Sequence, residues 1–116
     1  MKLYQYPKCS TCRKAVKYLN EQGIEFESID ITLHPPSIEE LELMLNSMGD
    51  KKKLFNTSGV QYRELKMKDQ LPLMSDDEAV KLLSGNGKLI KRPFLLNEAK
   101  GVVGFKEELW QEFLQS

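Results

Sequence analysis

Two cysteines, Cys9 and Cys12, are the residues of this sequence whose type and spacing best suit chemistry. They are its only cysteines. They follow an alternating aromatic segment that predicts a strand, and they open a segment with helical periodicity. The first turn of a helix presents unpaired backbone N–H groups and the positive end of the helix dipole, both of which stabilise a thiolate. We therefore expect the pKa of Cys9 to lie below the free-cysteine value of about 8.5, so that Cys9 is a nucleophile.

Cys12 lies one helical turn after Cys9, and this spacing lets its sulfur attack a mixed disulfide formed at Cys9. Cys12 also falls on the apolar face of the predicted helix, with Ala15, Val16 and Leu19 at helical spacing. We expect it to be the buried thiol with the higher pKa. The pair therefore predicts a redox-active centre whose oxidised form is a Cys9–Cys12 disulfide. Four basic residues nearby add positive charge: Lys8, Arg13, Lys14 and Lys17.

Two other interpretations of the cysteine pair are open. The cysteines could be inert small hydrophobic residues, or they could form half of a zinc site. Zinc would need two more ligands, and the other strong candidate in the sequence is His34. The position of the pair between a strand and a helix favours redox chemistry, for which we expect no metal and no organic cofactor.

The dipeptide Arg92-Pro93 is the second candidate feature, because it interrupts a segment, Leu89 to Leu96, that predicts a strand. In the functional interpretation, Arg92 lies beside Cys9 and binds its thiolate or an oxyanion. In the structural interpretation, Arg92 is exposed on an edge strand and Pro93 occupies a bulge. We favour the functional interpretation because an interrupted strand often marks a site.

The elements that must position these residues can be predicted along the chain. Strands at 3–6 and 24–31 flank the helix that begins at the cysteine turn, which makes a βαβ unit with parallel strands. The segment at about 37–86 lacks strand alternation and contains two Ser-x-x-Glu capping boxes, at Ser37 and Ser75, so it predicts a helical insert.

The C-terminal part of the chain predicts two more strands and a helix. The simplest arrangement pairs the predicted strands at 89–96 and 102–103 in a hairpin, and the last predicted helix covers 105–114. The order is therefore βαβ, a helical insert, then ββα. This order predicts an α/β chain with a thioredoxin-like fold, a four-stranded mixed sheet and an inserted helical subdomain, in a single domain over residues 1–116.

Length and composition exclude several classes of protein. The chain of 116 residues has 17 Lys+Arg and 17 Asp+Glu, and the resulting net charge of +0 argues against direct nucleic-acid binding. No apolar run approaches the roughly 18 residues of a membrane helix, so we expect no membrane association. Two cysteines in one tetrapeptide do not make a secreted disulfide scaffold, and we expect a cytoplasmic protein.

Together, the segment from Tyr4 to Ala15 with its cysteine turn, the Arg92-Pro93 strand start and Val103-Gly104-Phe105 resemble the arsenate reductase (ArsC)/Spx family. This resemblance covers nearly the whole chain. It implies a thioredoxin-like fold with a helical insert and an active thiol at Cys9. Thioredoxin-like domains also place a cis proline facing the cysteine turn, at the position of Pro93, where it would shape the substrate groove.

The resemblance is incomplete at several positions. Arsenate reductases of the glutaredoxin-linked type have one cysteine in this turn, which matches Cys9, and several arginines that hold the oxyanion, one of which matches Arg92. Asn56 and Phe105 stand where further arginines would be expected, and Gln5 stands where a histidine would be expected. The CxxC pair instead resembles the Spx branch, whose members are transcription regulators that sense oxidation and bind RNA polymerase.

Two hypotheses follow from the residues and the resemblance. The first is an arsenate reductase-like thiol–disulfide oxidoreductase, with Cys9 as nucleophile, Cys12 as resolving thiol and Arg92 as the stabilising cation. Arg13 and Pro93 are possible supporting residues. Its reductant would be a small-molecule thiol or a thioredoxin- or glutaredoxin-type protein. The alternative is a non-enzymatic, Spx-like redox-sensing adaptor that binds RNA polymerase.

Overall fold

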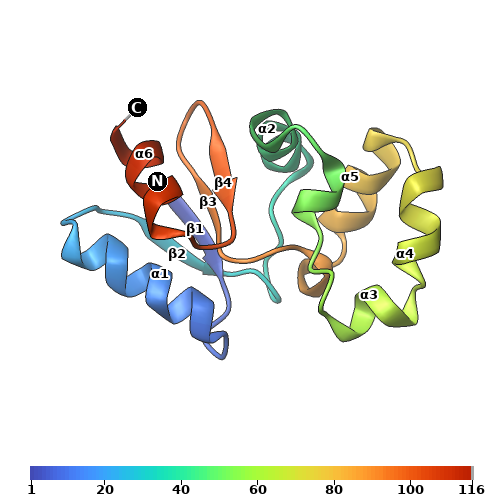
Figure 1. Cartoon of the computed structure of the whole chain (residues 1–116), viewed down its shortest axis with the longest axis horizontal. Helices are drawn as coiled ribbons and strands as arrows, with labels where there is room; N and C mark the ends of the chain where they lie inside the picture. Colours follow the sequence, from blue (N-terminus) through green and yellow to red (C-terminus); the bar gives the residue numbers. More distant parts are fainter. Residues whose placement is uncertain (116) are drawn as a thin grey trace.

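The computed structural model describes residues 1–115, and it contains a four-stranded mixed sheet with helices on both faces (Figure 1). The strands are β1 (Lys2–Gln5), β2 (Glu27–Asp30), β3 (Phe94–Leu96) and β4 (Gly101–Val103). Their order is β2-β1-β3-β4, with β1 parallel to β2 and antiparallel to β3, and with β3 antiparallel to β4. This is the βαβ–ββα arrangement that the sequence predicts, and the expected thioredoxin-like fold is confirmed.

Two helices, α1 (Ser10–Glu21) and α6 (Glu107–Gln115), cover one face of the sheet (Figure 1). Their apolar residues pack with inward side chains of the strands, such as Leu3 and Leu95, in one continuous core. Trp110 is fully buried there, and its indole N–H donates a hydrogen bond of 2.8 Å to the carbonyl of Gly104. This bond satisfies the single polar group of a large buried side chain.

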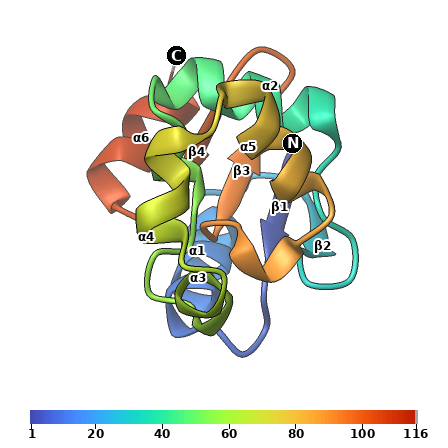
Figure 2. The same cartoon turned by 90° about the vertical axis from the view of Figure 1, so that its right-hand side faces the viewer.

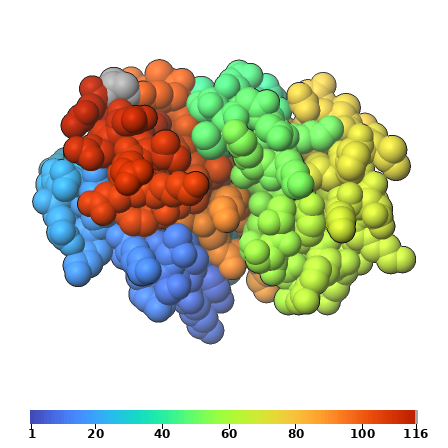
Figure 3. Space-filling model, viewed as in Figure 1, coloured from blue at the N-terminus to red at the C-terminus, as the bar shows by residue number. Residues whose placement is uncertain are grey.

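The segment between β2 and β3 is helical, as the sequence predicts. It contains α2 (Ile38–Met48), α3 (Val60–Glu64), α4 (Met67–Gln70), α5 (Asp76–Ser84) and the 3-10 turns η1 (Lys51–Leu54), η2 (Leu71–Leu73) and η3 (Gly87–Leu89). Both predicted capping boxes are formed, at the starts of α2 and α5. Figure 2 shows this insert in front of the sheet, and Figure 3 shows it as one side of the molecular surface.

The third strand begins later than the sequence predicts. Residues 87–89 form η3, and Ile90 makes an isolated antiparallel bridge to Phe55 of the insert, so the expected strand from Leu89 is wrong in its first half. Strand pairing begins at Phe94, directly after a cis peptide bond between Arg92 and Pro93. The reason is local, since proline has no N–H to donate to a strand ladder.

The second strand is also shorter than the predicted range of 24–31. Gly23, with a φ of 69°, continues the end of α1, and the N–H of Ile24 donates a 3.1 Å hydrogen bond to the carbonyl of Leu19. Ile24 therefore belongs to the closing turn of the helix and not to the sheet.

The last residue of the predicted domain, Ser116, lies outside the described residues. No helix within residues 1–115 has the length and apolar character needed to cross a membrane.

Candidate thiol redox site

The turn from β1 into α1 places Cys9 at the N-cap of the helix, with an extended backbone (φ −92°, ψ 118°). The N–H of Cys9 donates to the carbonyl of Tyr6 at 3.0 Å, which closes the turn. The N–H of Cys12 donates to the sulfur of Cys9 at 3.3 Å, so the thiol takes the capping role that a serine usually has. Cys9 is partly exposed, whereas Cys12 is fully buried.

The surroundings of the two thiols separate their pKa values. Burial raises the pKa of Cys9, but hydrogen bonds from the side chain and backbone of Cys12 and the guanidinium of Arg92 outweigh it, and the net pKa is lowered. Burial also raises the pKa of Cys12, as does the neighbouring Cys9; the backbone of Tyr6 and the charge of Arg92 oppose this rise, and the result is about 12. The structure therefore holds one ionisable thiol beside one protonated thiol, both of them free.

Arg92 enters the site from the segment before β3. Its guanidinium carbon lies 5.1 Å from the centroid of the Tyr6 ring, and its charge acts on Cys9. The fold thus brings together Cys9 and Arg92, which the sequence analysis singled out separately. Pro93, the next residue in the chain, is buried. The guanidinium of Arg13 donates a 3.1 Å hydrogen bond to the carbonyl of Pro7. Arg13 therefore stabilises the backbone of the cysteine turn.

A cavity of about 300 Å³ adjoins this site. It is lined mainly by polar and basic side chains: Tyr6, Thr32, Asn56, Gln61, Lys88 and Arg92. The sequence analysis named Asn56 and Arg92 but missed Thr32, Gln61 and Lys88, which belong to no motif. Phe105 does not line the cavity. Its ring is half-buried and packs against the core beneath α1 and α6. Its centroid lies 5.0 Å from that of Trp110 and 5.6 Å from that of Tyr18.

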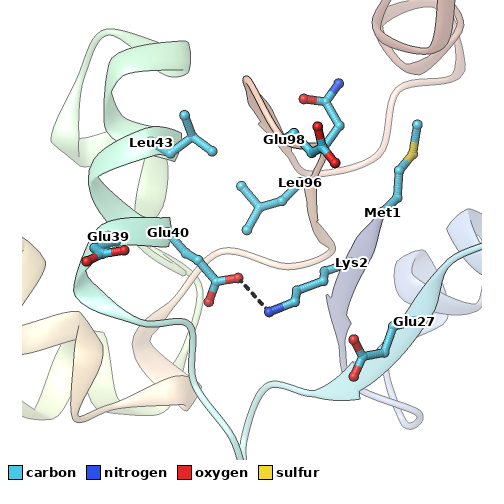
Figure 4. Close-up of a pocket in the computed structure, with 9 residues that line it drawn as sticks. Met1, Lys2, Glu27, Glu39, Glu40, Leu43, Leu96 and Glu98 are labelled. Carbon is cyan, nitrogen blue, oxygen red and sulfur yellow. Dashed lines mark hydrogen bonds and ion pairs between the residues drawn. The ribbon is translucent and has the colours of Figure 1, made fainter.

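A larger cavity, of about 660 Å³, lies at the opposite end of β1, between this strand and α2 (Figure 4). Glu40 is one of the residues that line this cavity, and its carboxylate already has hydrogen-bond and ion-pair partners. It accepts hydrogen bonds from Tyr4 Oη at 2.7 Å and from the N–H of Ser37 at 3.0 Å, and it pairs with Lys2 at 3.3 Å. Burial raises the pKa of Glu40, but these contacts outweigh it, and the net pKa is lowered. The carboxylate therefore joins α2 to β1 and is a structural group.

The candidate metal ligands do not gather at one point. Within residues 1–115, the structure contains no group of three or more His, Cys, Asp or Glu side chains placed to hold a metal ion. His34 is exposed in the connector after β2.

The thioredoxin-like sheet, with an ionisable cysteine at the start of α1, places this chain in the class of thiol redox folds. Within this class, the chain belongs to the ArsC family, whose model matches residues 4–113. The chain is 52% identical to the uncharacterized protein YusI of Bacillus subtilis strain 168, over 94% of this chain and 93% of the relative. It is 34% identical to the global transcriptional regulator Spx of Enterococcus faecalis, over 97% of this chain and 84% of the relative.

Solved structures agree with this assignment. A possible arsenate reductase from Streptococcus mutans UA159 superposes with a TM-score of 0.87 at 43% identity, and the match covers 95% of this chain and 96% of the other. The family therefore includes relatives named as reductases and relatives named as regulators.

The lowered pKa of Cys9 predicts how its alkylation depends on pH. Iodoacetamide reacts with the thiolate, so its rate with Cys9 should rise through a pH below that of an ordinary cysteine. In Arg92→Gln, we expect the whole profile to move to higher pH, because the thiolate loses a neighbouring cation. The rate at neutral pH should fall in consequence. Mass spectrometry of the alkylated protein measures this rate and shows which cysteine has reacted.

Arg13→Gln is the matched control for this experiment, because it removes the same charge from the first turn of α1. Arg13 contacts the carbonyl of Pro7, so its loss should move the profile less than the loss of Arg92. Equal shifts in the two variants would mean that Arg92 acts only through the net charge of the region.

Proposed function

We propose that this protein is a thiol–disulfide oxidoreductase that reduces organic disulfides with the Cys9–Cys12 pair. The observation that carries the proposal is the asymmetry of the two thiols. Cys9 has a lowered pKa and is partly exposed, while Cys12 is buried with a pKa of about 12 and donates its N–H to the Cys9 sulfur. Attack and resolution need this division between an exposed thiolate and a nearby protonated thiol.

The proposed reaction transfers two electrons from the cysteine pair to the substrate. The Cys9 thiolate attacks one sulfur of R–S–S–R′, which forms a Cys9–S–S–R bond and expels R′S⁻. Cys12 then loses its proton to water and attacks the sulfur of Cys9, which forms the Cys9–Cys12 disulfide and expels RS⁻. The released thiolates take up protons from solvent. An external dithiol of the thioredoxin or glutaredoxin type, or a small thiol, returns two electrons and restores the free pair.

Organic disulfides suit the site better than arsenate. Arsenate carries about two negative charges near neutral pH, and a dianion generally needs several charge-assisted donors. Asn56 and Phe105 occupy the positions where the family resemblance implies arginines, and Phe105 packs against the core. A disulfide is uncharged at its reacting bond and needs no such set.

A turnover assay with three oxidants tests the proposal. The protein is supplied with dithiothreitol and with bis(2-hydroxyethyl) disulfide, a cysteine-containing disulfide or arsenate, and loss of the reductant is followed above the uncatalysed rate. We expect catalysed reduction of the disulfides and little reduction of arsenate. Absence of turnover with every disulfide, in protein whose Cys9 remains reactive, would refute the proposal.

The second candidate function is a redox-sensing adaptor that binds RNA polymerase. The observation that favours it is the CxxC pair in a chain 34% identical to the regulator Spx of Enterococcus faecalis. The two functions can be separated by affinity capture of purified RNA polymerase with the dithiol and disulfide forms of the protein. Capture that depends on the redox state would favour the adaptor, and no capture in either state would exclude it.

A further inference from the structure

Tyr6 contacts the cysteine site in two ways, through its backbone and through its ring. Its carbonyl accepts the N–H of Cys9 at 3.0 Å, which closes the turn. Its ring is partly buried and packs against the core between the sheet and the helical insert. The guanidinium carbon of Arg92 lies 5.1 Å from the centroid of this ring, within the roughly 6 Å over which an aromatic face attracts a cation. The core therefore fixes the ring against which Arg92 stacks.

Arg92 is not held in place by a carboxylate, because the ion pairs found within residues 1–115 do not include it. An arginine side chain can adopt many rotamers, and its charge stabilises a thiolate only in those that keep the guanidinium close to the sulfur. A contact that restricts these rotamers therefore decides how strongly Arg92 acts on Cys9. The ring of Tyr6 is such a contact.

An aromatic ring suits this task better than a carboxylate would. A carboxylate in the place of the ring would neutralise the guanidinium and compete with the Cys9 thiolate for it. The ring attracts the cation through its quadrupole and is itself uncharged near neutral pH, so the positive charge of Arg92 still acts on the thiolate.

The other charged groups of this region are more exposed than Arg92. The titratable and charged groups come from the cysteine turn and α1, from the segment before β3 and from η3: Lys8, Cys12, Arg13, Lys14, Arg92 and Lys88. The lysines and Arg13 are exposed, so solvent and salt screen their charges. Arg92 is half-buried, and it acts on Cys9 together with the buried Cys12.

We propose that Tyr6 is a positioning residue of this site, whose ring holds the guanidinium of Arg92 beside the sulfur of Cys9 and leaves its charge free to stabilise the thiolate. Tyr6 acts through Arg92 and not on the sulfur itself. The inference rests on the proposed function only for the use that is made of the thiolate. Alkylation of Cys9 tests the positioning role without any disulfide turnover.

Tyr6→Leu tests the role of the ring, because it removes the aromatic face and keeps an apolar side chain against the core. The rate of iodoacetamide alkylation of Cys9 is measured from acid to alkaline pH by mass spectrometry. We expect the profile to move to higher pH by about half a unit, the size of one partly exposed cation–π contact. At pH values below the pKa, the rate should fall about threefold. An unchanged profile would overturn the proposal.

Tyr6→Phe is the matched control, because it keeps the ring and removes the hydroxyl alone. Its alkylation profile should stay within about 0.2 pH unit of the wild-type profile, since phenylalanine also attracts a cation to its face. Equal shifts in Tyr6→Phe and Tyr6→Leu would assign the effect to the hydroxyl and overturn the role of the ring. Circular dichroism checks the fold of each variant, and Tyr6→Met takes the place of Tyr6→Leu if the latter is unfolded.

A double-mutant cycle separates positioning of Arg92 from a general effect on the cysteine turn. Tyr6→Leu is introduced into Arg92→Gln, which has no cation for the ring to hold. If Tyr6 acts through Arg92, the second substitution should add less than about 0.2 pH unit to the shift of Arg92→Gln alone. A further shift as large as that of Tyr6→Leu in the wild-type protein would show that the ring acts on Cys9 independently, and it would overturn the proposal.

The same variants distinguish this inference from the proposed function. With bis(2-hydroxyethyl) disulfide at neutral pH, we expect Tyr6→Leu to be about threefold slower than the wild-type protein and Tyr6→Phe to have the wild-type rate. If the wild-type protein reduces no disulfide but the alkylation profiles shift as expected, the proposed function fails and the role of Tyr6 stands. If disulfides are reduced and the profile of Tyr6→Leu does not move, the role of Tyr6 fails and the proposed function stands.

Discussion

Cys9→Ser is expected to lower the rate of disulfide reduction about 10³-fold or more, because the variant loses the attacking thiolate. Serine is also a preferred N-cap residue, so its hydroxyl can accept the N–H of Cys12 as the thiol does and the helix start should be retained. The fold is therefore expected to survive a change that removes the chemistry. The rate is measured as consumption of dithiothreitol with bis(2-hydroxyethyl) disulfide, and the fold by circular dichroism.

Cys12→Ser is the companion variant, and it should fail at a different step. Its Cys9 can still attack, but no thiol is present to resolve the product, so the protein should accumulate one substrate-derived thiol bound to Cys9. Intact-mass spectrometry detects this adduct. The assignment of roles would be reversed if Cys12→Ser lost the adduct and Cys9→Ser formed it.

The cysteine turn was predictable from sequence because its physics is local. The strand, the turn and the helix are contiguous in the chain, and the helical period alone places Cys12 on the buried face. Capping boxes at Ser37 and Ser75 need only four residues each, and both formed. The position of Arg92 beside Cys9 required more, namely the prediction that the segment before the hairpin lies against the cysteine turn in a thioredoxin-like fold.

The cavity beside the turn was not predictable in the same way. Thr32, Gln61 and Lys88 come from separate segments with no shared spacing, and only tertiary packing brings them to one wall. An unsatisfied buried oxygen, such as Oε1 of Gln61, is likewise a property of packing and not of residue order. The start of β3 was misplaced because Ile90 has the apolar character of a sheet residue but pairs with Phe55 of the insert.

A close backbone contact at the same junction predicts a large effect on stability. Gly87 is buried in η3, and a Cβ atom placed on it would lie 1.8 Å from the carbonyl oxygen of Ile31 and 3.2 Å from Cα of Thr32. Both neighbours are backbone atoms, so no side-chain rotation relieves the overlap. We expect Gly87→Ala to lower the free energy of unfolding by about 3 kcal/mol, the upper part of the usual range for overpacking. Urea denaturation measures this loss.

Gly85→Ala is the control within the same segment, because Gly85 is exposed, its φ is −102°, and the nearest atom to an added Cβ is the carbonyl oxygen of Leu82 at 3.9 Å. Alanine fits this backbone and restricts the unfolded chain, so the variant should be unchanged or more stable by about 0.4–1 kcal/mol. Equal stability of the two variants would contradict the close contact. Cys9 lies on a separate element, so it should remain reactive to iodoacetamide in both variants.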